Sequence, residues 1–248
     1  MKKLELKKVN HSVKVGDSCG EITPNITEDT VFYDNGNPIG FYLKKIPSNL
    51  KKFIDIANNE LLSDRVPKST MKRSSGVLQY STILGGVPPK PNMRRNYKSI
   101  SSVHRSKSAK NFIKAMLLAC KESEKLIKQI IPEQYEKQLK IFEKVEDQYK
   151  FGNLFTSSIS NCNISAPFHR DTGNIKETVN VIIVKKKGAK GGNTTIPDYN
   201  ATVDSCEDSM LVYPAWRNVH GVTPIIETHK GGYRNSLVFY PLKAFLEE

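Results

Sequence analysis

Two histidines and an aspartate stand at positions from which they could bind a metal. The segment from Phe168 to Asn174 reads Phe-His-Arg-Asp-Thr-Gly-Asn, so one residue separates His169 from Asp171. On an extended strand, residues with this spacing point to the same face. His220 follows 51 residues after His169. Two imidazoles and one carboxylate can occupy one face of an Fe(II) ion and leave three positions open. The pattern predicts a non-haem iron site.

A second pair of residues suggests what binds beside the iron. A lone His-x-Asp pair often arises by chance, but here Arg234 follows 14 residues after His220, and Ser236 stands two residues beyond it. The guanidinium of Arg234 has a planar fork that pairs bidentately with a carboxylate. Ser236 can add a hydroxyl donor. The dicarboxylate 2-oxoglutarate chelates iron through its keto-acid end, so this pair could hold its distal carboxylate. The sequence therefore predicts a 2-oxoglutarate-dependent Fe(II) oxygenase.

The second half of the chain contains the elements that must position these residues. From Phe151 onward, short β-rich runs alternate with Gly, Pro, Asn and Asp, which is typical of a sandwich or barrel. Ser236 begins one of these runs, and Arg234 stands two residues before it. The predicted strands are residues 154–159, 178–184, 193–196, 210–213 and 236–240.

The first half predicts a hairpin and several helices. Residues 31–43 contain Asn35-Gly36, a pair that supplies the positive φ angles of a tight turn. The predicted helices are residues 48–62 with Ser48 as N-cap, residues 108–131 with Ser108 as N-cap, and residues 133–148 after Pro132. These helices should buttress a sheet. The run Gly85-Gly-Val-Pro-Pro predicts a loop, because it suits neither a helix nor a central strand.

Positive charge is concentrated in one stretch. The formal net charge is +13, and residues 65–110 hold eleven Lys or Arg residues and no Asp or Glu. Such a surface favours a polyanionic partner, because each neutralised phosphate releases condensed counterions. A solvated loop that only maintains solubility is the alternative. Because the stretch also contains Tyr80 and Tyr97, we expect it to contact nucleic acid, with Arg94 and Arg95 among the contacting residues.

The composition predicts an intracellular, monomeric protein. With 38% apolar residues, the chain has no run near the roughly 18 to 20 apolar residues of a membrane helix. Its first residues, Met-Lys-Lys-Leu-Glu-Leu-Lys-Lys, lack an apolar signal core. No Cys-x-x-Cys pair occurs, which argues against a zinc knuckle. We expect reduced thiols and a location with DNA, in the cytoplasm or nucleoid, or in a nucleus. The four scattered cysteines are Cys19, Cys120, Cys162 and Cys206.

The segment from His169 to Asn174 resembles the His-x-Asp-x-x-Asn element of the TET/JBP dioxygenases, which oxidise the 5-methyl group of pyrimidines in DNA. The resemblance covers residues 151–242. It includes His220 and the run Gly231-Gly-Tyr-Arg-Asn-Ser-Leu-Val-Phe-Tyr, which looks like the final core strand of that family. The Cys-rich zinc subdomain of the animal enzymes has no counterpart in this chain. The chain therefore resembles a compact microbial or viral member.

The resemblance implies a fold and a set of site residues. We expect an α+β protein whose double-stranded β-helix (jelly roll) core is buttressed by α-helices. A single domain should span residues 1–248, with N-terminal strands and a helix (1–64), a basic DNA-contacting segment (65–110), support helices (109–148) and the jelly-roll core (151–245). The implied roles are Fe(II) binding by His169, Asp171 and His220, 2-oxoglutarate binding by Arg234 and Ser236, and contact with the target base by Asn174.

Three hypotheses of function follow. The first is a DNA dioxygenase that flips 5-methylcytosine out of a duplex and converts it to 5-hydroxymethylcytosine or beyond, or that converts thymine to 5-hydroxymethyluracil. The second is an oxygenase of a protein, RNA or small molecule. The third is a DNA-binding jelly roll with a vestigial triad, which the intact triad and Arg-x-Ser disfavour. The basic stretch favours the first over the second.

The roles of several further polar residues stay open at this stage. We expect His104 and His229 to be surface and turn residues, and Trp216 to pack beneath His220. Asn163 and Asn180 could bond the co-substrate.

Overall fold

The computed structural model describes residues 1–71 and 79–247, and its largest sheet has ten strands. Nine follow the order β1-β2-β3-β13-β9-β16-β7-β5-β4, and β6 pairs with the edge of β5. All these pairings are antiparallel except β1 with β2. The strands are β1 (Lys2–Glu5), β2 (Thr30–Asp34), β3 (Asn37–Leu43), β4 (Ser69–Met71), β5 (Gln79–Val87), β6 (Ser99–Ile100), β7 (Ser157–Cys162), β9 (Asn180–Lys187), β13 (Met210–Tyr213) and β16 (Tyr233–Tyr240).

A smaller sheet faces part of the large one and completes the jelly roll. It has four strands in the order β12-β11-β14-β8. A cavity lies between the two sheets, because residues of both line it. The smaller sheet contains β8 (Ala166–His169), β11 (Thr194–Ile196), β12 (Ala201–Val203) and β14 (His220–Val222), and a separate pair is formed by β10 (Ala189–Gly191) and β15 (Ile225–Glu227).

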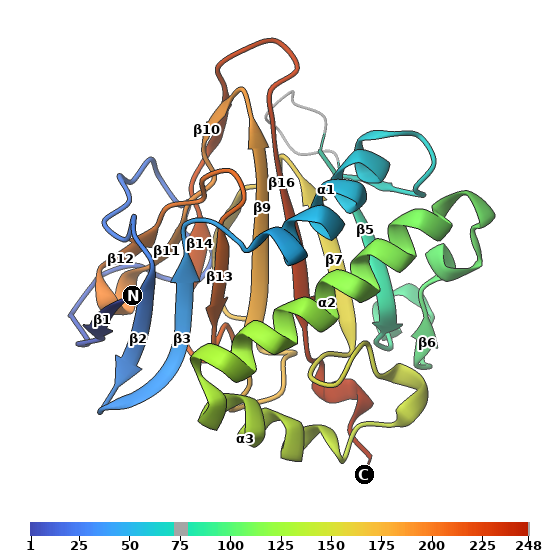
Figure 1. Ribbon diagram of the computed structural model, residues 1–248, viewed down its shortest axis with the longest axis horizontal. Coiled ribbons are helices and arrows are strands. Elements are labelled where there is room, and N and C mark those ends of the chain that lie inside the picture. Colours follow the sequence, from blue (N-terminus) through green and yellow to red (C-terminus); the bar gives the residue numbers. More distant parts are fainter. Residues whose placement is uncertain (72–78, 248) are drawn as a thin grey trace.

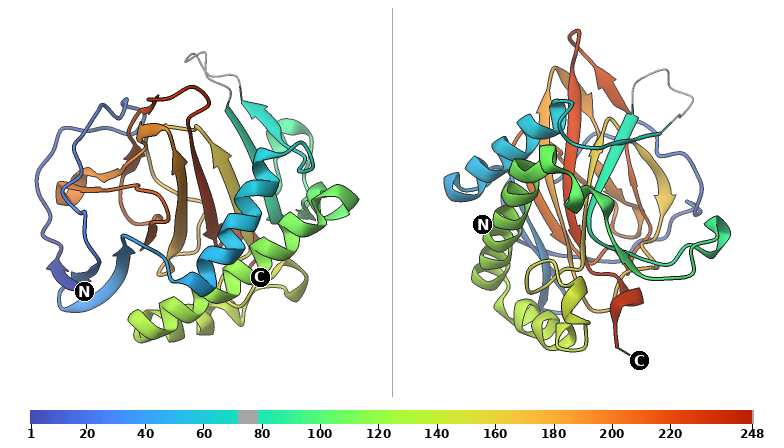
Figure 2. Two further views of the ribbon diagram at one scale, coloured as in Figure 1. Left: turned by 45° about the horizontal axis from the view of Figure 1, so that its top comes forward. Right: turned by 90° about the vertical axis from the view of Figure 1, so that its right-hand side faces the viewer.

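Three α-helices cover the other face of the large sheet (Figures 1 and 2). They are α1 (Ser48–Leu62), α2 (Lys110–Ile130) and α3 (Pro132–Phe142). Short 3-10 turns complete the described elements: η1 (Pro91–Met93), η2 (Ser102–Arg105), η3 (Lys107–Ala109), η4 (Asp147–Tyr149), η5 (Pro197–Tyr199) and η6 (Lys243–Phe245). No helix among the described residues is both long and apolar enough to cross a membrane.

Strand β16 shows how the sheet keeps its two faces distinct. Leu237 and Phe239 are fully buried in the core formed with the helices. Arg234 and Ser236 line the cavity instead. Side chains alternate between faces along a strand, so one run of sequence supplies both the core and the site. The apolar core between the sheet and the helices therefore stabilises the same strands that carry the polar residues of the cavity.

The main elements of the first half are confirmed. The hairpin β2–β3 turns at Asn35 and Gly36, whose φ angles are 51° and 76°. Helix α1 has the predicted bounds, but Pro47 occupies its N-cap position and no side chain caps it, so the prediction of Ser48 as N-cap is wrong. Ser48 is instead the first residue of the helix.

Two other helix boundaries also differ from the predictions. Helix α2 begins only at Lys110, because η3 precedes it, and the Ser108 hydroxyl donates to the carbonyl of Arg65 instead of capping. Helix α3 begins at Pro132 as expected but ends at Phe142 rather than near residue 148. The side chain of Phe142 is buried in a small cluster with Val145 and Phe245, so the residues just after the helix pack as part of this cluster.

The loop predicted at Gly85-Gly86 is a strand, and this is the main correction to the fold. Strand β5 continues through both glycines to Val87. A Cβ atom on Gly85 would lie 2.4 Å from the Thr156 carbonyl, and one on Gly86 would lie 2.6 Å from the Phe245 ring. Glycine within a strand often marks such close approach of another segment. The glycines therefore permit packing rather than ending the strand.

Candidate active site

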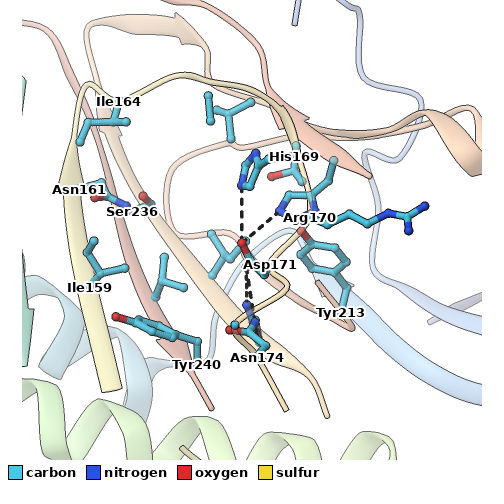
Figure 3. A pocket seen from close by; sticks show the side chains of 18 of the residues that line it. Ile159, Asn161, Ile164, His169, Arg170, Asp171, Asn174, Tyr213, Ser236 and Tyr240 are labelled. Atoms are coloured by element: carbon cyan, nitrogen blue, oxygen red, sulfur yellow. Dashed lines mark hydrogen bonds and ion pairs between the residues drawn. The ribbon is translucent and has the colours of Figure 1, made fainter. Parts of the chain in front are cut away.

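The paired ends of β8 and β14 bring the two histidines together. His220 lies directly opposite His169 in the register of these strands, and their ring centroids are 4.4 Å apart. Asp171 follows in the turn after β8, so it reaches the site from a turn rather than from the extended strand that we predicted. Its Oδ1 lies 3.6 Å from His169 Nε2 and 4.0 Å from His220 Nε2 (Figure 3).

Backbone carbonyls fix which ring nitrogen each histidine presents. The Nδ1 of His169 lies 2.8 Å from the Pro167 carbonyl, and the Nδ1 of His220 lies 3.1 Å from the Asn218 carbonyl. A carbonyl only accepts, so each Nδ1 must carry the proton. Both Nε2 lone pairs are then free and converge with Asp171. Ligand atoms of all three residues lie within 4.8 Å of one another, which suits a single ion.

Two buried asparagines orient the carboxylate of Asp171. Asn180 Nδ2 donates to Asp171 Oδ2 at 3.1 Å. Asn174 Nδ2 donates to Asn180 Oδ1 at 2.9 Å and lies 3.5 Å from the same Asp171 oxygen. The other oxygen, Oδ1, is left facing the histidines. Asn180 thus supports a candidate metal ligand, whereas the sequence suggested it only as a residue that could bond the co-substrate.

Burial keeps one ligand neutral. His220 is 5% exposed, and burial lowers the pKa of its imidazole, although the nearby Asp171 opposes that shift. A neutral imidazole is the form that binds a metal. The Tyr213 ring packs edge-on against His220 with centroids 5.4 Å apart. The aromatic contact that we expected from Trp216 therefore comes from Tyr213, and the Trp216 indole donates instead to the Thr178 carbonyl.

Arg234 is a buried cation without a partner for its charge. It is 2% exposed, and its Nε has no hydrogen-bond partner within the described structure. Burial lowers the pKa of its guanidinium to about 10, so it stays protonated at neutral pH. Its backbone exchanges hydrogen bonds with Asn163, which fixes that end of β16. A buried cation of this kind requires an anion.

These residues fit Fe(II) and 2-oxoglutarate. The cavity has a volume of about 500 Å³, and the triad, Arg234 and Ser236 all line it. Two imidazoles and one carboxylate are the donor set of non-haem Fe(II) oxygenases. The unpartnered guanidinium is suited to the distal carboxylate of the co-substrate, with the Ser236 hydroxyl beside it. Arg170, between His169 and Asp171, also lines the cavity, but its guanidinium extends away from these two residues (Figure 3).

Arg94 and Arg95 lie apart from this cavity. Both lie in the loop between β5 and β6, where Arg94 is exposed and has a φ of 56°. Arg95 is half-buried and braces the loop, since its guanidinium donates to the Ser99 hydroxyl at 2.9 Å and to the Pro88 carbonyl. The structure therefore does not bring the predicted DNA-contacting pair together with the metal ligands.

His104 differs from its prediction as a surface residue. It is half-buried, and its Nε2 accepts a hydrogen bond of 2.8 Å from the Gly85 amide. Burial lowers the pKa of its ring, which favours the neutral, accepting form. His104 thus satisfies a polar group at the edge of β5. His229 lies in the turn before β16, as predicted.

Together, the jelly roll and this set of donors define a 2-oxoglutarate-dependent Fe(II) dioxygenase. Residues 88–243 match the Tet_JBP family model, described as the oxygenase domain of the 2OGFeDO superfamily. This match covers more than half of the chain, and the protein belongs to that family.

The first of three solved structures that match the chain supports the fold. NgTET1 in complex with 5mC DNA has a TM-score of 0.63 and 14% sequence identity, and the match covers 96% of this chain and 85% of that one. A 2OG-Fe(II) oxygenase family protein from Burkholderia pseudomallei has a TM-score of 0.45 and 13% identity, over 80% of this chain and 83% of its own. OsALKBH1 has a TM-score of 0.42 and 15% identity, over 80% and 96%. No curated protein matches the chain.

Proposed function

We propose that the protein hydroxylates the 5-methyl group of a pyrimidine in DNA, with 5-methylcytosine as the preferred base. The product is 5-hydroxymethylcytosine, which can be oxidised further. A methyl group inside a base stack cannot reach a metal between two sheets, so the target base must be flipped out of the duplex. The basic stretch 65–110 would contact the phosphates during this step, with Arg94 as an exposed contact.

The observation that carries the preference for cytosine is the orientation of Asn174. An ionised carboxylate only accepts hydrogen bonds, so Asp171 requires the Nδ2 groups of Asn180 and Asn174 to point towards it. The remaining atom, Asn174 Oδ1, has no protein donor among the described residues, and Asn174 lines the cavity. This oxygen can accept from the exocyclic amine of cytosine, whereas thymine presents an oxygen at that position.

The rest of the cavity suits a planar ring. Tyr240, Ile159 and Val238 line it on the side of the large sheet. Burial raises the pKa of the Tyr240 hydroxyl, so this ring stays neutral at any working pH. Flat apolar walls with a small number of polar groups are typical of sites that orient a small molecule or a base.

The residues of the cavity would have separate roles in the reaction. Fe(II) with 2-oxoglutarate and dioxygen supplies an oxidant for a C–H bond, and the overall reaction yields a hydroxymethyl group, succinate and carbon dioxide. His169, Asp171 and His220 would hold the metal. Arg234 would hold the co-substrate, and its burial excludes water from that end. The hydrogen-bonded side chains of Asn180 and Asn174 would hold Asp171 and the base in one fixed geometry.

Mass spectrometry of nucleosides tests this proposal. The protein should be incubated with methylated or unmethylated DNA, iron, ascorbate and 2-oxoglutarate, and Asp171→Ala should serve as the inactive control. We expect 5-hydroxymethylcytosine from methylated DNA. A 5-hydroxymethyluracil product would assign thymine instead, and succinate without any modified nucleoside would move the substrate to a protein, RNA or small molecule. Asn174→Ala should reduce the preference for cytosine over thymine while uncoupled succinate formation continues.

A further inference from the structure

A second hollow lies next to the active-site cavity, at the edge of the large sheet. It has a volume of about 480 Å³ and occupies the space beside β5 between β4 and β6. We call it the β5-edge groove. Its cationic and aromatic lining residues are Lys68, Arg95, Tyr97 and Arg105. Among the described residues, no Asp or Glu lines it.

The groove and the cavity share one face of the sheet. In the register of β5 with β7, Ile83 lies opposite Ile159 and Ser81 lies opposite Asn161. Directly opposed residues point to the same face. Ile159 and Asn161 line the cavity, and Ile83 and Ser81 line the groove. Neighbouring strands of a sheet lie about 4.8 Å apart, and successive nucleotides of a DNA strand are about 3.4 Å apart along the helix axis. The groove and the cavity, which adjoin neighbouring strands, are therefore separated by on the order of one or two nucleotide steps.

The charge of the groove is not neutralised by the protein. Among the described residues, Lys68, Arg95 and Arg105 form no ion pair with a carboxylate, and the hydrogen bonds of Lys68 and Arg95 go to carbonyls or a hydroxyl. Arg105 is exposed. Three cations on one concave surface without a counter-charge favour a ligand with closely spaced negative charges, such as a phosphodiester chain.

The groove also has an exposed aromatic ring. Tyr97 lines the groove beside these cations and is 64% exposed, so its ring is accessible to a ligand. Proteins that bind single strands combine a basic groove with aromatic side chains on which bases stack. Closely spaced cations beside an accessible ring favour a nucleic-acid strand, which brings a regular row of phosphates together with bases that stack.

We propose that the β5-edge groove holds the stretch of the target DNA strand next to the flipped base, with its phosphates on Arg105 and Lys68 and a flanking base on Tyr97. The proposal rests on the function proposed above and assigns the binding of the strand to residues outside the catalytic cavity. The flanking nucleotide would then be held while its neighbour turns into the cavity.

Binding of a fluorescent oligonucleotide containing 5-methylcytosine tests the groove directly. Fluorescence anisotropy should show that Tyr97→Ala weakens binding roughly fivefold or more, which is the range for loss of one base–aromatic stack. Tyr97→Phe should bind like the parent. Arg105→Glu should lower the slope of log affinity against log salt by about one or more. Lys121→Glu, an equal charge change at an exposed position of α2 on the helical face, should have little effect.

Two outcomes would overturn the proposal, and they are distinguishable from failure of the function itself. If Tyr97→Ala and Arg105→Glu bind and oxidise DNA like the parent, the groove is wrong but the function stands. If Lys121→Glu weakens binding as much as Arg105→Glu, only the net charge matters and the groove is wrong. A parent that neither binds nor oxidises DNA removes both proposals. Uncoupled succinate formation at the parental rate verifies that each variant is folded.

Discussion

The active-site cavity and the basic stretch 65–110 place polar residues in opposite ways. In the cavity, the polar side chains are buried or half-buried and are held by hydrogen bonds within the protein, as the Asn180 side chain holds Asp171 and the Asn218 carbonyl holds His220. In the described part of the basic stretch, Arg94 and Arg105 are exposed, and neither forms an ion pair there. The cavity fixes geometry before any ligand binds, which favours chemistry, whereas the basic stretch offers charge, which favours affinity without a fixed register. Substitutions in the cavity should therefore impair the chemistry, and substitutions in the basic stretch should impair DNA affinity.

Loss of a triad ligand should have the largest effect. His169→Ala should abolish metal-dependent succinate formation and weaken metal binding, because only two ligands remain, while the fold stays intact. Metal content after reconstitution and the far-ultraviolet circular dichroism spectrum measure these effects. Arg170→Ala is the matched control, since the guanidinium of this neighbouring residue extends away from His169 and Asp171 (Figure 3). Near-normal succinate production by His169→Ala would contradict the assignment.

Much of this region could be predicted from the sequence, because register and side-chain alternation follow from residue spacing. His169, His220 and the Arg234–Ser236 alternation fall where expected, within the shared cavity, and Asp171 joins them from a turn instead of the predicted strand. The Asn180 bond to Asp171 could not be predicted, since it joins two segments whose distance depends on tertiary packing. For the same reason, the strand character of Gly85-Gly86 was missed, because the Phe245 ring that requires the glycine lies about 160 residues away in the chain.

Removal of the buried guanidinium should have the next largest effect. Arg234→Ala should raise the 2-oxoglutarate requirement at least tenfold, since loss of a charged pair in a desolvated pocket costs about 2 to 5 kcal/mol. Arg234→Lys should lie between the parent and Arg234→Ala, because it keeps the charge and loses the fork. The measurements are the co-substrate dependence of turnover and the thermal shift caused by N-oxalylglycine. An unchanged requirement would remove Arg234 from the co-substrate site.

The basic stretch should respond differently. Reversal of Arg94 and Arg95 to Glu should flatten the dependence of DNA affinity on salt and lower activity on long DNA, while uncoupled 2-oxoglutarate decarboxylation survives. The single variants sharpen this comparison. Arg94→Ala should change only DNA binding, whereas Arg95→Ala should also lower the unfolding free energy by about 1 kcal/mol, because Arg95 braces its loop. Parental DNA binding by the double variant would make the stretch a solubility surface.

The smallest effect concerns His104, which links the edge of β5 to η2. Burial lowers the pKa of its ring below the ordinary 6.5, so just below pH 6.5 the unfolded chain binds more protons than the folded one. The stabilisation by its bond to Gly85 is complete above pH 6.5 and is lost as the pH falls through the folded pKa. Denaturant unfolding should give a difference of about 1 kcal/mol between the parent and His104→Leu at neutral pH, which shrinks in acid. A difference independent of pH would refute this role.

The measurement that tests the central claim most directly is the coupling between succinate and modified nucleoside in the same samples. With 5-methylcytosine DNA, the parent should form succinate and oxidised cytosine in nearly equal amounts, and succinate formation should slow when DNA is omitted. Reversal of Arg94 and Arg95 should lower the nucleoside yield more than the uncoupled succinate, and Arg234→Ala should lower both. Equal rates of succinate formation with and without DNA, and no change in any nucleoside, would contradict the account.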